Sequence, residues 1–121
     1  CAACHQLKGK GKVVGPQLDG IGNRGLDRIV EDILDPNRNV DVAFRSESIA
    51  LKSGDVISAL VRKNHPRTLL IANTAGQEQV IPKNEITSRT SSSSSLMPDN
   101  FHQAIPERGF HDLIAFLLNQ R

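Results

Sequence analysis

The stretch Cys1-Ala2-Ala3-Cys4-His5 places both cysteines of this 121-residue chain directly beside a histidine. Two residues separate the cysteines, so a single helical turn would bring both thiols to the same face. A disulfide across so short a loop would stabilise the fold little, because the entropy that a disulfide removes from the unfolded chain grows with loop length. The two cysteines therefore indicate a chemical role.

Four kinds of chemistry compete for this pattern. A structural zinc site usually needs four Cys or His ligands, and the remaining histidines, His65, His102 and His111, form no paired ligand motif. A thioredoxin-like dithiol would begin a helix within a βαβ pattern, which the chain lacks, and an inert disulfide is equally unsupported. C-x-x-C-H is the pattern of covalent haem attachment, in which each thiol forms a thioether to the porphyrin and the histidine ligates the iron. We favour this last interpretation.

Met97, the only methionine of the chain, is the candidate for the second axial ligand. It lies in Ser-Leu-Met-Pro (95–98), a loop by its composition, whereas a methionine that fills a core usually lies in an apolar stripe. Methionine paired with histidine on the iron is typical of cytochromes c and raises the reduction potential. The alternatives are a loop methionine that packs on the core, and ligation by His102, His65 or His111.

Hydrophobic periodicity predicts two helices separated by a β-rich segment. Apolar residues recur with helical spacing over residues 26–34, before Pro36, and again over residues 106–121. Between them, short alternating runs with turn signals predict a small antiparallel sheet or barrel of four or five strands, at about 46–90. The serine run at 91–95 is predicted to be loop that gives the Met97 segment slack.

The composition limits the possible functions. The chain contains four Phe, no Trp and no Tyr, so a bound cofactor would help to complete its core. A net charge of +2, without any basic stretch that also contains aromatic residues, argues against nucleic acid as a partner. No apolar run is long enough to predict a membrane-spanning helix.

Four segments together resemble the class I c-type cytochromes: CAACH (1–5), GPQLDGIGNRG (15–25), SLMP (95–98) and the final amphipathic helix. More narrowly, the chain resembles the planctomycete-type haem-binding domain found at the C-terminal end of larger predicted dehydrogenases. A β-rich segment similar to SESIALKSGDVISALV (46–61) lies in that domain before the methionine loop. The resemblance implies a mainly α cytochrome c fold with an inserted small antiparallel β module, α+β overall. Residues 1–121 would then be a single domain, with 46–90 as the inserted module.

The resemblance also implies roles for individual residues around one covalently bound haem c. The carbonyl of Pro16 would accept a hydrogen bond from the ring of His5 and so fix its tautomer. Leu18 and Ile21 would pack on the haem face, and Arg24 would pair with a propionate, although a solvated arginine is an equally good interpretation. The expected metal ligands are His5 and Met97. The full set of expected haem-binding residues is Cys1, Cys4, His5, Pro16, Leu18, Ile21, Arg24, Leu96 and Met97.

The function that follows from the resemblance is outer-sphere electron transfer outside the cytoplasm, for example in the periplasm, with a dehydrogenase as donor. That dehydrogenase would be a separate redox partner or a fused domain. Two alternatives stay open: a haem enzyme or a sensor of gas or peroxide with an open distal position, and a β module that is itself the functional interaction domain. Class I cytochromes also have a helix before the haem motif, so we expect the sequence to be the C-terminal portion of a longer polypeptide.

Overall fold

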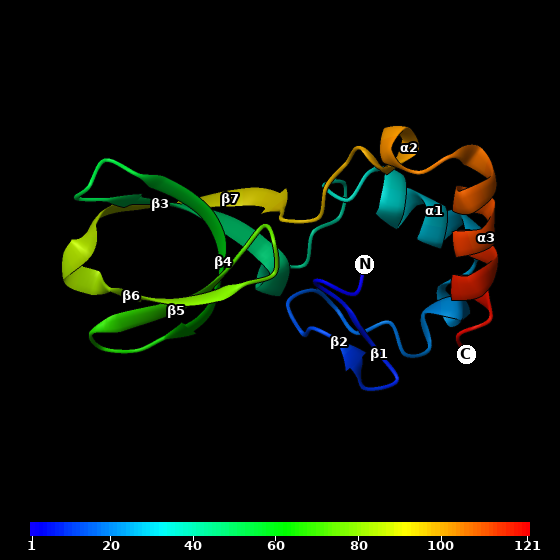
Figure 1. Cartoon of the computed structure of the whole chain (residues 1–121), viewed down its shortest axis with the longest axis horizontal. Helices are drawn as coiled ribbons and strands as arrows, with labels where there is room; N and C mark the ends of the chain where they lie inside the picture. Colours follow the sequence, from blue (N-terminus) through cyan, green and yellow to red (C-terminus); the bar gives the residue numbers. More distant parts are fainter. The chain divides into compact units, whose positions relative to one another are not determined.

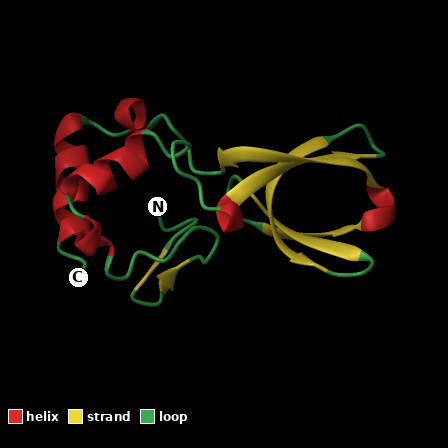
Figure 2. Ribbon diagram, turned by 180° about the vertical axis from the view of Figure 1, so that it is seen from behind, coloured by secondary structure: helices red, strands yellow, loops and turns green.

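The computed structural model describes residues 1–121, which form two compact units (Figure 1). The helical unit comprises Cys1–Asn39 and Met97–Arg121, and the sheet unit comprises Val40–Leu96. Helices account for 29% of the chain and strands for 34% (Figure 2). The expected mainly α fold is therefore wrong, because the segment predicted as a minor insertion forms a five-stranded antiparallel sheet that outweighs the helices.

Both predicted helices are confirmed in the helical unit. α1 (Leu26–Leu34) ends just before Asp35 and Pro36, and α3 (Glu107–Leu118) begins directly after Pro106. A proline fits this position because the first backbone N–H groups of a helix have no partner within the helix. The short elements of this unit were not predicted: the hairpin strands β1 (Gln6–Leu7) and β2 (Lys10–Gly11), the 3₁₀ helix η1 (Ile21–Arg24), and α2 (Phe101–Ala104).

The core of the helical unit is small. Ile29 and Ile33 of α1 pack with Ile114 and Leu117 of α3, and these four side chains are buried. A larger group of apolar side chains packs against them but stays only partly buried: Leu18, Ile21, Val30, Met97, Phe101, Phe110, Leu113 and Leu118. This core therefore keeps apolar surface in contact with solvent.

At Gly22, the backbone of η1 closely approaches the C-terminal end of α3. Its N–H donates to the carbonyl oxygen of Gln120 at 2.9 Å, and a Cβ on Gly22 would overlap the carbonyl group of Leu118. Because the obstacle is backbone rather than a flexible side chain, one of the two elements would have to move.

We expect Gly22→Ala to lower the free energy of unfolding of the helical unit by about 1–3 kcal/mol, the usual cost of an added methyl group in a tightly packed site. Urea unfolding monitored by circular dichroism would measure the loss. The neighbouring Asn23→Ala is the matched control, since Asn23 is exposed and its replacement should change stability by less than about 0.5 kcal/mol. Equal stability of the two variants would contradict the close approach.

The sheet unit has the strand order β6-β5-β4-β3-β7, and every neighbouring pair is antiparallel. The strands are β3 (Arg45–Leu51), β4 (Val56–Asn64), β5 (Thr68–Asn73), β6 (Glu78–Pro82) and β7 (Ile86–Ser95). Two 3₁₀ turns, η2 (Val42–Phe44) and η3 (Lys83–Glu85), precede β3 and β7. Gly54 and Gly76 have positive φ angles in the β3–β4 and β5–β6 turns, at the positions where the sequence predicts turns.

The sheet unit has a hydrophobic core of its own. Ile49, Leu69 and Ile71 are fully buried, and Ala59 and Ile81 complete the cluster. Alternation explains this result, because every second residue of a strand points to the same face of a sheet. On an exposed part of this unit, Arg89 donates two hydrogen bonds to Glu47, at 2.8 and 2.9 Å, and these raise the pKa of Arg89 above its ordinary value.

The serine run is strand rather than loop, which corrects the sequence prediction. Ser91 pairs with Glu47 and Ser95 pairs with Arg45, with a register irregularity between the two pairs. The hydroxyl of the buried Ser46 donates to the carbonyl oxygen of Ser94 at 3.1 Å. Pairing with β3 therefore overrides the weak strand preference of serine, and the sheet extends five residues beyond the predicted limit of 90.

Candidate functional site

Residues 1–5 form a single helical turn, as the cysteine spacing predicts. The carbonyl oxygen of Cys1 accepts from the N–H of Cys4 at 3.0 Å and from the N–H of His5 at 2.8 Å. Both cysteines are free thiols; Cys1 is exposed and Cys4 is half-buried. The turn therefore keeps two unpaired thiols within four residues of each other, beside the histidine.

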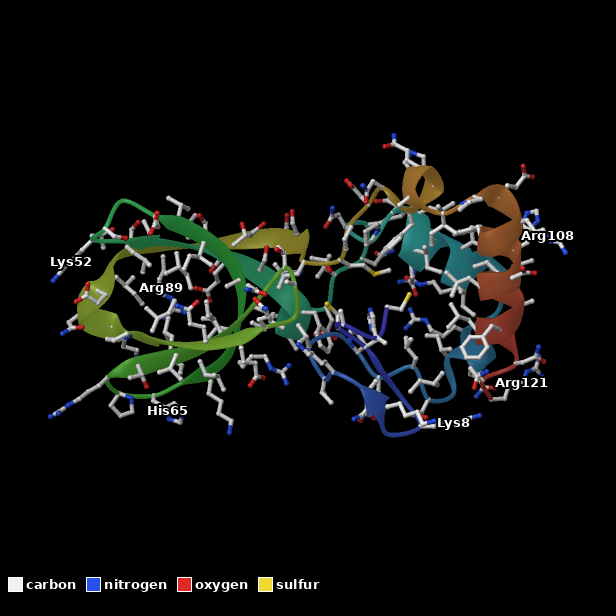
Figure 3. The ribbon with its side chains drawn as sticks, in the orientation of Figure 1. Lys8, Lys52, His65, Arg89, Arg108 and Arg121 are labelled. Carbon is white, nitrogen blue, oxygen red and sulfur yellow. The ribbon has the colours of Figure 1, made fainter.

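A tight hairpin reverses the chain directly after this turn. β1 and β2 are joined by Lys8 and Gly9, which have φ angles of 49° and 75°. Two consecutive positive φ angles are typical of the type I′ turn, which suits the twist of a two-residue hairpin. The N–H of Lys8 donates to the carboxylate of Asp19 at 2.8 Å, which ties the hairpin tip (labelled by Lys8 in Figure 3) to the following loop.

The hairpin returns the chain to the CAACH turn. The carbonyl oxygen of Cys4 accepts from the N–H groups of Val14 and Gly15, at 2.9 and 2.7 Å, and Val14 is buried. Backbone hydrogen bonds thus attach the glycine-rich segment that follows the motif to the residues of the motif. The sequence gives only an indirect sign of this arrangement, in the closely spaced glycines that follow the motif.

The ring of His5 has a defined orientation. Its Nδ1 donates to the carbonyl oxygen of Pro16 at 2.7 Å. Because a carbonyl oxygen only accepts, Nδ1 must carry the hydrogen, so in the neutral ring Nε2 holds the lone pair that can bind a metal. This is the contact that the cytochrome resemblance implies between these two residues.

The other expected haem-binding residues occupy different settings. Leu18, Ile21 and Met97 pack partly buried against the core of the helical unit, so the structure brings these three to one apolar cluster. Arg24 is exposed and forms an ion pair with Asp32 of α1 at 3.1 Å. Leu96 is half-buried and is the last residue of the sheet unit.

The three histidines considered as rival ligands are all exposed. His65 lies in the turn between β4 and β5 of the sheet unit (labelled in Figure 3), whereas His102 and His111 lie on α2 and α3. The structure also forms no group of three or more His, Cys, Asp and Glu side chains suited to a metal ion. Nothing in the arrangement therefore favours these histidines over Met97, or a zinc site over haem.

The comparison with protein families bears directly on the CAACH turn. Residues 1–50 match the cytochrome c family model. The match implies a covalently bound haem c, and the candidate attachment residues Cys1 and Cys4 lie inside the matched region. Cytochrome c domains are typically electron-transfer modules and usually act outside the cytoplasm.

The cytochrome c match ends in β3, so it includes Pro16, Leu18, Ile21 and Arg24 but neither Met97 nor most of the sheet unit. No curated protein sequence matches the chain. The structure contains no helix with the length and apolar character needed to cross a membrane.

The residues present fit haem c. Two free thiols lie on one turn, the adjacent His5 has Nε2 available, and partly buried apolar side chains gather in the same unit. Thioether formation needs free thiols, and iron ligation needs an unprotonated ring nitrogen. Cys1 and Cys4 would hold the porphyrin covalently, and His5 would hold the iron.

Proposed function

We propose that this chain is a mono-haem c-type cytochrome domain that performs outer-sphere electron transfer, with His5 and Met97 as the axial ligands of the iron. The hydrogen bond from His5 Nδ1 to the carbonyl oxygen of Pro16 carries the proposal. A bond of this kind fixes the tautomer and raises the basicity of a ligating histidine. It would be of no use to a redox dithiol, which needs only the thiols.

The packing of Met97 supports its role as the second ligand. Met97 packs against the core between α1 and α3 and is only partly buried, so it is held in place without being enclosed. Leu18 and Ile21 belong to the same cluster. A planar apolar group placed against these side chains would gain roughly 25 cal/mol for each Å² of apolar surface removed from water.

The protein residues have three tasks in electron transfer. Cys1 and Cys4 keep the group attached, His5 and Met97 stay bound in both oxidation states, and the apolar cluster excludes water from the ligands. When bound, haem c supplies the iron that changes oxidation state. Because both ligands would stay in place, the protein would change little between the two states, and such rigidity favours rapid electron transfer.

We further propose that the electron donor is a dehydrogenase, either a separate protein or part of the same polypeptide, and that the domain acts in the periplasm or an equivalent compartment. The resemblance to the planctomycete-type haem-binding domain supports the choice of partner. The usual location of cytochrome c domains outside the cytoplasm supports the choice of compartment.

The proposal is tested by absorption spectra of the protein produced in a host that attaches haem c. We expect a low-spin spectrum in both oxidation states, the weak ferric charge-transfer band of an iron–methionine bond, and no carbon monoxide binding after reduction. Without that band, and with ready carbon monoxide binding, the open-site enzyme or sensor would replace the electron-transfer function.

We propose as an alternative that the sheet unit, which has a hydrophobic core of its own, is a partner-binding module. Deleting residues 46–88 should then leave the haem spectrum intact and abolish binding of the redox partner. Retained partner binding would assign the interaction to the helical unit instead.

A further inference from the structure

Gly15 lies against the ring of His5. A Cβ on Gly15 would be 2.7 Å from Cε1, 2.9 Å from Nδ1 and 3.2 Å from Nε2 of that ring. These three distances are similar. A Cβ that lay in the ring plane, beyond the Cε1 edge, would be clearly farther from both nitrogens, so the Cβ position of residue 15 lies over the face of the ring. The Gly15 backbone therefore covers one face of the imidazole.

The backbone conformation of Gly15 does not require glycine. Six glycines of the chain have positive φ angles, and Gly15 is not among them. Its φ angle therefore lies outside the left-handed region that favours glycine. The three atoms nearest to a Cβ at this position all belong to the His5 ring, so the ring is the first obstacle that a side chain on residue 15 would meet.

The segment that carries Gly15 has little freedom to move away from the ring. Gly15 and the buried Val14 both donate to the carbonyl oxygen of Cys4, and the N–H of Lys12 donates to the carbonyl oxygen of Ala2 at 3.1 Å. These bonds attach one side of the segment to the turn that also carries His5. An added methyl group would therefore displace the imidazole more readily than the backbone.

We propose that Gly15 is a positioning residue that sets the plane of the His5 imidazole. The carbonyl of Pro16 fixes the ring through a bond in its plane, and the backbone of Gly15 blocks rotation by contact with its face. This inference rests on the proposed haem function, in which the ring plane of His5 becomes the plane of an axial ligand. Ring orientation would then be set by backbone atoms, which vary less in position than side chains.

The test compares Gly15→Ala with Gly109→Ala in the haem-loaded protein. Gly109 also lacks a positive φ angle, and the atom nearest to a Cβ there is Cγ2 of Ile105 at 3.3 Å, so Gly109→Ala adds the same methyl group without touching His5. We expect Gly15→Ala alone to change the ferric low-spin g values, which depend on ligand-plane orientation. In the ferrous protein, exchange of the His5 Nδ1 hydrogen should accelerate about tenfold as the bond to Pro16 weakens. Unchanged g values and unchanged exchange in Gly15→Ala would overturn the proposal.

A measurement on the unmodified protein covers the case in which Gly15→Ala does not fold. In the ferrous state, we expect a nuclear Overhauser contact between the Gly15 Hα atoms and the His5 ring, and its absence would overturn the proposal. Failure of the haem function is distinguishable, because the unmodified protein would then show no low-spin spectrum at all.

Discussion

Replacing Met97 by alanine is expected to open the sixth coordination position of the iron and to lower the reduction potential. Axial ligands set haem potentials over a range of about 0.8 V, so loss of the thioether should lower the potential by at least about 0.1 V. The ferric charge-transfer band of the iron–methionine bond should disappear, and the reduced protein should bind carbon monoxide. Redox titration followed by absorption spectroscopy would measure all three changes.

Met97→Leu separates ligation from packing, because Met97 also contacts the apolar core of the helical unit. Leucine nearly keeps the volume of methionine, and such swaps usually cost less than about 1.5 kcal/mol. If Met97 only packs, Met97→Leu should keep the original spectrum, and that outcome would exclude Met97 as a ligand. His102→Ala, at an exposed position five residues further on, should leave the spectrum unchanged.

Replacing both Cys1 and Cys4 by serine is expected to abolish covalent attachment completely. The single variants should each keep one thioether, because both thiols are free and each would form its own thioether. Mass spectrometry under denaturing conditions would find haem on the unmodified chain and on the single variants, but none on the double variant. The reduced spectrum should also shift in the single variants.

Serine is the matched replacement, since its hydroxyl is close in size to the thiol and forms no thioether. The helical turn is made by backbone bonds to the Cys1 carbonyl, so these replacements should leave it intact. Covalently bound haem on the double variant would contradict the assignment of both cysteines.

Local sequence patterns predicted the helices accurately because each helix buries one apolar stripe. Ile29 and Ile33 recur with helical spacing and are buried, as are Ile114 and Leu117. The mainly α expectation failed for a different reason. It came from the family resemblance, which made the β segment a small insertion, whereas the alternating runs at about 46–90 predicted a sheet or barrel of four or five strands, and the structure has a five-stranded sheet.

Contacts between residues far apart in the chain were harder to predict from the sequence. Composition alone makes Ser91–Ser95 a loop, and only pairing with β3 turns it into a strand. The contact between Pro16 and His5 was implied by the resemblance and not by spacing. The face contact of Gly15 gives no sequence signal of its own, because it depends on how a hairpin returns the chain to the CAACH turn.

The pairing of Arg45 with Ser95 lowers the chain entropy that the helical unit loses when it folds. The sheet unit spans about 57 residues, yet its first and last strands bring the two ends of that span together. Once the sheet has folded, the connection from α1 to Met97 behaves as a loop of about 13 residues, made of residues 35–45 and 95–96. Because the entropy cost of loop closure grows as the logarithm of length, this shortening saves roughly 1.4 kcal/mol. A folded sheet thus makes the loop-closure entropy of the helical unit close to that of a chain with a short loop between α1 and Met97.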